Sequence, residues 1–158
     1  MKKFIHTLFS ATLFFFSVQV FAEELTVYSR TQTASHLDIG EKGYSVGDSI
    51  VRIGSLHFEE NGPAVGNFYS KSELKHIDTN KKNDLRFFSS EAMLPNGSIY
   101  IMDFTIVANG EVFAGAGHKH NGIILGGTDK YAGIRGTYDI SVHPKDNKKS
   151  KITYNIIR

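Results

Sequence analysis

Turn signals recur along this chain and divide it into short segments rich in β-branched and aromatic residues. Asparagine–glycine and glycine–glycine pairs between apolar runs are the strongest short-range indication of a β-hairpin. They occur at Asn61-Gly62, Asn96-Gly97, Asn109-Gly110 and Gly126-Gly127. No long segment shows helical periodicity. The chain is therefore predicted to be all-β, either an antiparallel sandwich or a closed up-and-down barrel.

The same pattern locates the strands and one long loop. The predicted strands are 25–31, 49–59, 65–77, 84–93, 98–107, 111–119, 121–125, 132–143 and 150–157. The stretch 32–47 is the longest without a strand signal, and we expect it to form a loop at one mouth of the fold. Long loops inside compact domains are more often functional than idle.

The first 22 residues have the features of a secretory signal peptide. Lys2 and Lys3 form a basic start, an apolar core follows, and Ala22 ends a small-residue cleavage motif. An uncleaved membrane anchor is the alternative, because the apolar segment has a marginal length for a bilayer span. Cleavage would leave one domain, residues 23–158, in the periplasm or outside the cell and without a membrane attachment.

Removal of the predicted leader would also change the charge of the chain. The full sequence has 18 Lys and Arg and 16 Asp and Glu residues. Because Lys2 and Lys3 lie in the leader, the mature domain would have 16 of each and no net charge. This balance argues against a nucleic-acid partner. The sequence has no cysteine, so neither a disulfide nor a lipid attached through cysteine can form.

A glycine-rich run from Gly126 to Gly136 is the most distinctive segment of the chain. Its first glycine pair suits a tight turn. After that turn, strand alternation would place Tyr131, Gly133 and Arg135 on one face. Gly133 would then leave space in which the Arg135 guanidinium could be seated within a sheet or against a ligand. The simpler alternative is a hairpin with an arginine on its surface.

The run resembles the closing motif of the allene oxide cyclase barrel superfamily, which includes the dirigent proteins. Asp129 and Ile134 stand where that motif usually has Gly and Ala. The segment from His36 to Asp48 is similar to the D-x-G-x-x-G-x-S-x-G-D motif of bacterial members, and an apolar strand follows it. The resemblance spans Leu25 to Ile157 and implies an antiparallel up-and-down eight-stranded β-barrel with its chain ends close together.

The resemblance also implies a binding site in the barrel lumen. In dirigent relatives, acidic residues, arginine and tyrosine at pocket positions bind and protonate a quinone methide. Asp48 and Arg135 match such positions and are the candidate catalytic residues. A carboxylate beside a guanidinium in an apolar cavity would stay charged and orient a polar ligand. The alternative is a structural ion pair that ties the mouth loop to the last strands.

Aromatic side chains supply further candidates for ligand binding. They are Tyr69, Tyr100, Phe104 and Tyr131, and packing in the core or rim is the alternative for each tyrosine. In the strand 99–107 both faces are mostly apolar, so the face turned outward requires a cover. Because dirigent relatives are trimers, the resemblance implies a homotrimer or dimer, with cover by another part of the same chain as the alternative.

No metal site or cofactor is predicted. His118 and His120 would point the same way on a strand and could hold a metal with a third ligand. His57, His76 or Glu111 could supply that ligand, but nothing in the sequence places them nearby. The residues that follow His120 also indicate a bend. No nucleophile or nucleotide-binding motif is present.

Three functions remain open from the sequence. The first is an exported barrel that binds a small apolar or phenolic molecule and guides its cyclisation or stereoselective coupling. The second is an isomerase or cyclase that uses Asp48 and Arg135. The third is a structural or interaction protein whose barrel is filled by its own side chains. Six of the 12 phenylalanines lie in the leader, which favours an open lumen in the mature domain.

Overall fold

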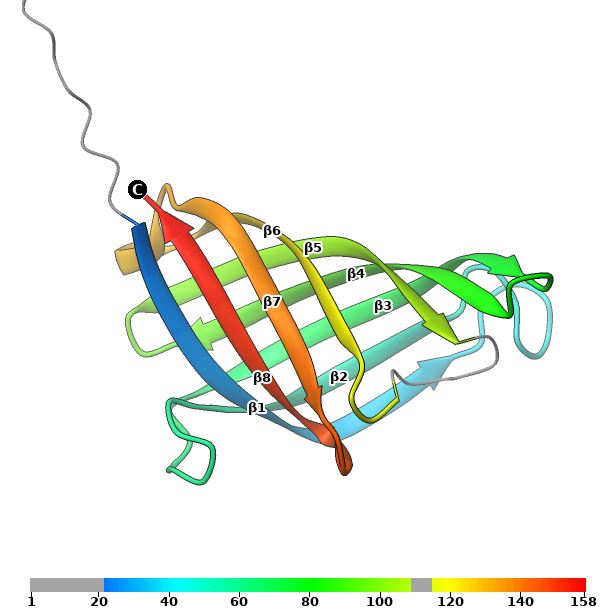
Figure 1. Ribbon diagram of the computed structural model, residues 1–158, viewed down its shortest axis with the longest axis horizontal. Coiled ribbons are helices and arrows are strands. Elements are labelled where there is room, and N and C mark those ends of the chain that lie inside the picture. The colour runs from blue at the N-terminus through cyan, green and yellow to red at the C-terminus, as the bar shows by residue number, and fades with distance from the viewer. Residues whose placement is uncertain (1–21, 109–114) are drawn as a thin grey trace, which may run out of the picture.

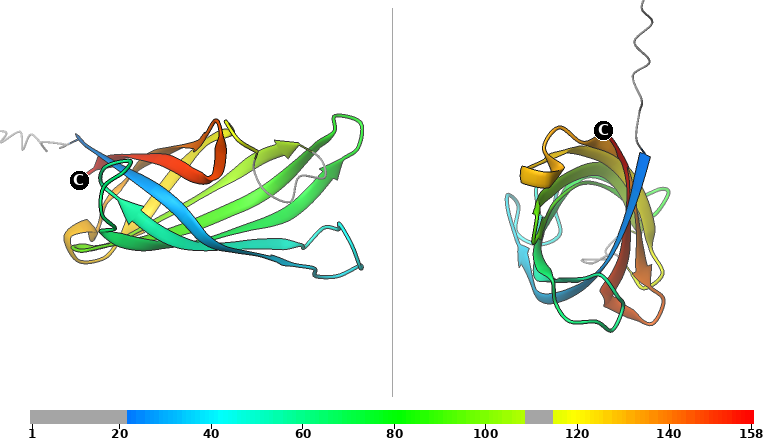
Figure 2. Two further views of the ribbon diagram at one scale, coloured as in Figure 1. Left: turned by 90° about the horizontal axis from the view of Figure 1, so that it is seen from below. Right: turned by 90° about the vertical axis from the view of Figure 1, so that its left-hand side faces the viewer.

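The computed structural model describes residues 22–108 and 115–158, which form one closed antiparallel barrel (Figure 1). Its strands are β1 (Ala22–Leu37), β2 (Ser49–His57), β3 (Gly66–Asp78), β4 (Asn83–Leu94), β5 (Gly97–Ala108), β6 (Lys119–Gly127), β7 (Arg135–His143) and β8 (Asp146–Ile157). Each strand pairs with its neighbour in sequence, and β1 pairs with β8 to close the ring (Figure 2). The predicted eight-stranded up-and-down barrel is confirmed.

Because the strands alternate in direction, the barrel has two distinct ends. Both chain ends of the barrel and the turns 58–65, 95–96 and 128–134 lie at the first, which we call the termini end (Figure 1). The loop 38–48 and the turns 79–82 and 144–145 lie at the second, which we call the loop end. Residues 1–21 of the predicted leader lie outside the described residues, so its cleavage stays a prediction. In the described part of the chain, no helix is long and apolar enough to cross a membrane.

Two predicted boundaries differ from the structure. β1 continues to Leu37, so only 38–48 is the mouth loop. A bulge between Thr31 and Thr33 absorbs an extra residue and keeps β1 paired with β2 through this polar stretch. Instead of separate strands at 111–119 and 121–125, there is one strand, β6, and residues 111–114 lie outside the described residues.

Gly122 marks a close approach between strands and not the bend that the sequence suggested. A Cβ atom added at Gly122 would lie 2.5 Å from the carbonyl oxygen of Met102 and 2.6 Å from the Cβ of Asp103. Any side chain here would push β6 away from β5. The strand therefore runs straight through this glycine, and His118 and His120 keep the same orientation.

The glycine-rich run does not continue as a strand after its first turn, so the predicted alternation is wrong. Asp129–Tyr131 form a short 3-10 helix, η1, and β7 begins only at Arg135. Asp129 and Gly133 both have positive φ angles, of 49° and 76°, which do not occur in a regular strand. The turn folds back over the termini end, where Tyr131 becomes part of the core.

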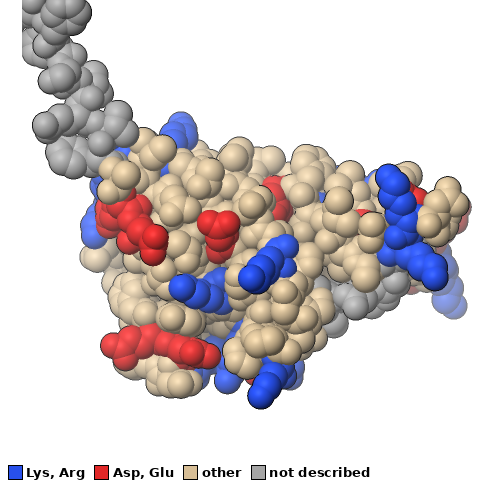
Figure 3. Space-filling view, in the orientation of Figure 1, with Lys and Arg blue, Asp and Glu red and all other residues tan. Residues whose placement is uncertain are grey.

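The interior is apolar at the termini end and polar at the loop end. The apolar half is filled by a cluster that includes Val27, Leu56, Ile99, Tyr131, Ile134, Tyr154 and Ile156. These side chains come from the inward faces of the strands and from the turn that carries η1. On the face shown in Figure 3, basic and acidic side chains are interspersed with neutral ones.

Candidate functional site

Asp48 holds the mouth loop in its folded shape. Its carboxylate is only 3 % exposed and accepts hydrogen bonds from the backbone N–H groups of Ile39, at 2.9 Å, and Ser45, at 3.0 Å. The Nε2 atom of His36 lies 3.4 Å from the same carboxylate. The two backbone hydrogen bonds, and next the neighbouring imidazole, lower the pKa of Asp48 below its ordinary value. These contacts within the loop are sufficient to explain why Asp48 is buried, without a role in ligand binding.

Arg135 lies at the opposite end of the barrel. It is exposed at the start of β7, and its Nη1 donates a hydrogen bond of 2.7 Å to the carbonyl of Ile134. Since Asp48 lies at the loop end and Arg135 at the termini end, the structure does not bring the two together. Neither the expected lumen pair nor the alternative ion pair is formed. A catalytic role for either residue stays a prediction.

The four aromatic candidates lie away from the polar half of the interior. Tyr69, Tyr100 and Phe104 point outward from β3 and β5, and Tyr131 is buried in the core of the termini end. The hydroxyl of Tyr100 donates a hydrogen bond of 3.2 Å to Glu91. Their role as ligand contacts stays a prediction, but none of them is positioned to contact a molecule inside the loop end.

The outward face of β5 is strongly exposed, as the sequence analysis expected of one of its faces. Phe104 is 61 % and Ile106 60 % exposed, and the apolar side chains of Ile123 and Leu125 on β6 are exposed as well. The Phe104 ring packs against Phe87 of β4, with 5.4 Å between ring centroids. We call Phe104, Ile106, Ile123 and Leu125 the apolar strip. Its cover by a second subunit stays a prediction.

The polar half of the interior holds a cluster of ionisable side chains, of which the sequence singled out only His118 and His120, as potential metal ligands. They are Arg52 of β2, Asp84 and Arg86 of β4, Asp103 of β5, His118 just before β6, His120 of β6 and Tyr138 of β7. The signal that could have found them was Asp103. It lies on the face of β5 that also carries Ile99, Ile101 and Val107, and a carboxylate on so apolar a face requires a partner inside.

Asp103 and His120 form the central pair of this cluster. The Nδ1 atom of His120 lies 2.5 Å from Oδ2 of Asp103, and the two side chains are 10 % and 4 % exposed. Because a carboxylate only accepts hydrogen bonds, Nδ1 carries the proton. This bond fixes the tautomer and the orientation of the imidazole, so that Nε2 is the atom that can exchange a proton with a ligand.

Tyr138, His118 and Thr105 surround the Asp103–His120 pair. The Tyr138 hydroxyl is buried beside Asp103, and burial first, then the charge of Asp103, raise the pKa of Tyr138, so it stays a neutral donor. His118 Nε2 lies 3.1 Å from the hydroxyl of Thr105. β5 is paired with β6 only from Ile99 to Met102, so the contacts from Asp103 and Thr105 to the two histidines join the strands where the backbone ladder ends.

Two arginines lie in the interior near the loop end, together with the carboxylates of Asp84 and Asp103. Burial first, and then the charge of Arg86, lower the pKa of Arg52. Arg86 donates a hydrogen bond of 3.2 Å to the hydroxyl of Tyr44, which belongs to the mouth loop, and lies 3.8 Å from Asp84. Two guanidinium groups in a protein interior favour a ligand with an anionic or strongly polarised oxygen.

The space available to a ligand is at the loop end. A cavity of 40 Å³ lies inside the barrel, lined among others by Arg52, Phe68, Phe88 and His120. A pocket of 350 Å³ at the mouth is lined by Thr31, Gln32, Ala34, Arg52, Asn147 and Lys148. Because Thr31 and Arg52 line both spaces, the pocket adjoins the cavity. Of these two spaces, only the mouth pocket has the size of a ligand site, about 300–1,000 Å³.

Metal binding finds no support in the described residues. Within 22–108 and 115–158, no three side chains of the His, Asp and Glu type are grouped so that they could hold an ion. Glu111, one of the potential ligands considered from the sequence, lies outside these ranges.

Comparison with known proteins relates the chain to others by fold. No protein-family model and no curated protein sequence matches it. Among solved structures, it is similar to a pyocyanin demethylase, with a TM-score of 0.67, 18% identity, and coverage of 85% of this chain and 99% of that one. It is similar to AbnU, an exo-specific intermolecular Diels-Alderase, with a TM-score of 0.67, 13% identity, and coverage of 89% and 99%.

A third similar structure is a pterocarpan synthase dirigent protein, with a TM-score of 0.56, 12% identity, and coverage of 90% of this chain and 87% of that one. Sequence identities this low show the shared fold alone. The chain thus has the eight-stranded barrel of the Diels-Alderase cyclases and the dirigent proteins, and the fold implied by the sequence resemblance is confirmed.

Proposed function

We propose that this barrel binds a small apolar or phenolic molecule at its loop end and guides the cyclisation or stereoselective coupling of that molecule. The observation that carries the proposal is the buried Asp103–His120 pair, which lies beside Arg52 in a cavity that adjoins the mouth pocket. Structural similarity to cyclases and dirigent proteins supports it. The ligand body would occupy the 350 Å³ mouth pocket, and its polar end would enter the cavity.

In this proposal each part of the site has a separate task. Arg52 and Arg86 stabilise negative charge that develops on a ligand oxygen. His120, oriented by Asp103, takes up or delivers one proton through Nε2. Phe68 and Phe88 line the cavity that the polar end enters, and they exclude water from it. A molecule that is already reactive needs little more than such positioning to cyclise or couple.

The acid–base residues of this proposal differ from Asp48 and Arg135, which the sequence resemblance implied. Asp48 and Arg135 lie at opposite ends of the barrel, so no single small ligand would touch both. Asp103 and His120 supply the pair of titratable groups instead. An alternative function, a structural or interaction protein with a filled barrel, is favoured by the small size of the inner cavity, 40 Å³.

Ligand capture from native extract tests the proposal. The mature protein is incubated with extract, reisolated, and its bound small molecules are identified by mass spectrometry. We expect a retained apolar or phenolic compound with the wild type and its loss with Arg52→Gln and with His120→Gln. Arg135→Gln, which removes a charge at the other end, serves as the matched control and should retain it. Equal retention by all four proteins would reject the site, and no retained compound would favour the filled barrel.

Export is the second part of the proposal and has its own test. The leader-like sequence of residues 1–22 supports it. We expect the protein in the periplasmic or culture fraction to begin at Glu23, as read by N-terminal sequencing. A full-length chain recovered with the membranes would contradict export with cleavage.

A further inference from the structure

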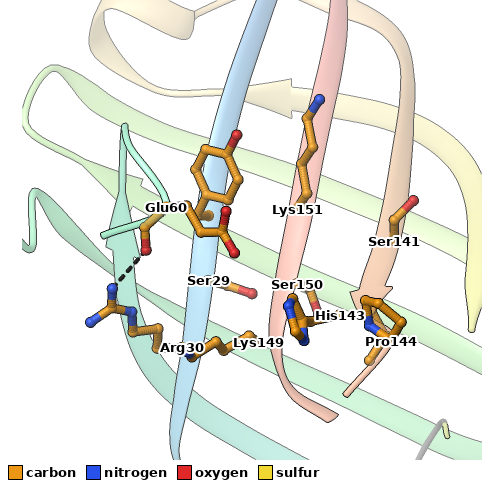
Figure 4. Close-up of a pocket in the computed structure, with 11 residues that line it drawn as sticks. Ser29, Arg30, Glu60, Ser141, His143, Pro144, Lys149, Ser150 and Lys151 are labelled. Atoms are coloured by element: carbon orange, nitrogen blue, oxygen red, sulfur yellow. Dashed lines mark hydrogen bonds between the residues drawn. The ribbon is translucent and has the colours of Figure 1, made fainter. Parts of the chain in front are cut away.

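A hollow on the outer wall of the barrel lies across β1, β7 and β8 from the interior cavity, with which it shares Ser29, Val142 and Ser150. It has a volume of 260 Å³ and lies over β1, β8 and β7, between the turn 58–65 and the β7–β8 turn (Figure 4). We call it the outer groove and define it by Tyr28, Arg30, Glu60, Pro144, Lys149 and Lys151. The register places these side chains together, because Tyr28 lies opposite Lys151 and Arg30 opposite Lys149.

The outer groove carries a net positive charge. Arg30, Lys149 and Lys151 are cationic, and Glu60 is the one carboxylate among its lining residues. Lys149 is partly neutralised, since its ammonium lies 3.9 Å from Asp146. Arg30 and Lys151 have no such carboxylate contact among the described residues. An anion is therefore the ligand that the charges favour.

Arg30 is held in one orientation by the backbone. Its Nη2 donates a hydrogen bond of 2.6 Å to the carbonyl oxygen of Glu60 (Figure 4). Its Nε is buried and has no hydrogen-bond partner within the described residues. A guanidinium that is already fixed loses less conformational freedom when it binds a carboxylate, so its orientation favours binding.

The turn that holds Arg30 is itself fixed by a buried histidine. His57 Nδ1 lies 2.8 Å from the carbonyl oxygen of Gly62, and His57 Nε2 lies 2.8 Å from the hydroxyl of Ser55. Since the carbonyl only accepts, Nδ1 carries the proton and the Ser55 hydroxyl donates to Nε2. The wall of the outer groove is thus joined to β2 through His57 and to β1 through Arg30.

We propose that the outer groove binds a small organic acid that contains a single ring. The carboxylate would be attracted by Arg30, Lys149 and Lys151, and the ring would lie against Tyr28 and Pro144. The volume of 260 Å³ sets the size, because it falls just below the range of pockets for drug-sized ligands, about 300–1,000 Å³. This site does not depend on the function proposed for the interior.

Binding of benzoate to the mature protein, followed by amide chemical shifts in NMR, tests this proposal. We expect saturable shifts at Tyr28 and Lys151 and none at His120. Benzamide, which has the ring without the charge, and inorganic phosphate, which has the charge without the ring, should both bind at least about tenfold more weakly. Equal binding of either probe, or the absence of saturable shifts at the outer groove, would overturn the proposal.

Two charge-removing variants and one control make the test specific. Lys151→Gln and Arg30→Gln should each weaken benzoate binding about tenfold, as expected for a lost charge-assisted hydrogen bond. Lys151 is the safer variant, because Arg30 also holds the turn. Lys145→Gln removes the same charge from the neighbouring turn outside the groove and should bind as the wild type does. An equal loss in the Lys145 and Lys151 variants would show unspecific attraction and contradict the site.

Discussion

Single side chains decide how each end of the barrel is organised. Asp48 and Asp103 are both buried carboxylates, but their partners differ in kind. Asp48 accepts backbone N–H groups of its own loop, which is a structural use. Asp103 instead contacts the side chain of His120, an imidazole in the barrel interior. The contrast assigns loop folding to the first carboxylate, whereas in the proposed function the second orients His120.

Asp48→Asn tests the structural assignment. The pKa of Asp48 lies below its ordinary value, so its ionised form stabilises the fold above that ordinary value and the stabilisation is lost as the pH falls through the lowered pKa. We therefore expect a lower unfolding midpoint for the variant at neutral pH and a shrinking difference from the wild type in acid. The measurement is thermal unfolding followed by circular dichroism across pH.

The control for this prediction is Asp38→Asn in the same loop. Asp38 is exposed and accepts one backbone bond, from Gly43 at 3.1 Å. It should change the unfolding midpoint much less than the Asp48 variant. If the two variants behave alike at every pH, the special role of Asp48 is lost.

Gly122→Ala tests the contact that brings β5 and β6 together. The added Cβ would meet Met102 and Asp103 at 2.5 and 2.6 Å, both distances too short for any real contact. We expect a loss of about 1–3 kcal/mol in the free energy of unfolding, as for other overpacked sites. Denaturant titration measures it. The exposed neighbour Asn121→Ala should be nearly neutral, and a neutral Gly122 variant would contradict the close approach.

Among the strands, β5 shows what sequence pattern can and cannot predict. Its two faces were separated correctly by alternation, but both are mostly apolar, so the pattern did not say which face is inside. The structure turns Asp103 and Thr105 inward and Phe104 and Ile106 outward. The ligand candidates Tyr100 and Phe104 were chosen from the face that turned out to be external.

The apolar strip on β5 and β6 leads to a prediction about assembly. With Phe104 and Ile106 each about 60 % exposed, this face is costly to leave in water, and we expect a homo-oligomer that covers it. Phe104→Asp should yield a monomer with the same circular dichroism spectrum, as judged by sedimentation velocity. Ile53→Asp, at an exposed site on the outside of β2, is the control and should leave the assembly intact. A wild type that sediments as a monomer contradicts the expectation.

For the whole molecule, the sequence predicted the barrel and its closure but not the division of its interior. Turn signals and the family resemblance were sufficient for eight antiparallel strands. The positions of Asp48 and Arg135 were misjudged because two motifs far apart in sequence were assumed to meet. The end of the barrel at which each residue lies depends on the number and direction of the strands between them. A sequence pattern must therefore place every intervening hairpin correctly before the two positions can be compared. The Arg52, Asp103 and His120 group was missed for the same reason, since its members come from different strands.

Ligand binding at the loop end can be followed by NMR at the histidine side chains. The mature protein, with labelled imidazoles, is titrated with 2-naphthol as an apolar phenolic probe. We predict saturable shifts at His118 and His120, no change at His57 or His143, and loss of the effect in Arg52→Gln. Shifts that do not saturate, or that appear equally at His143, would contradict a binding site inside the barrel.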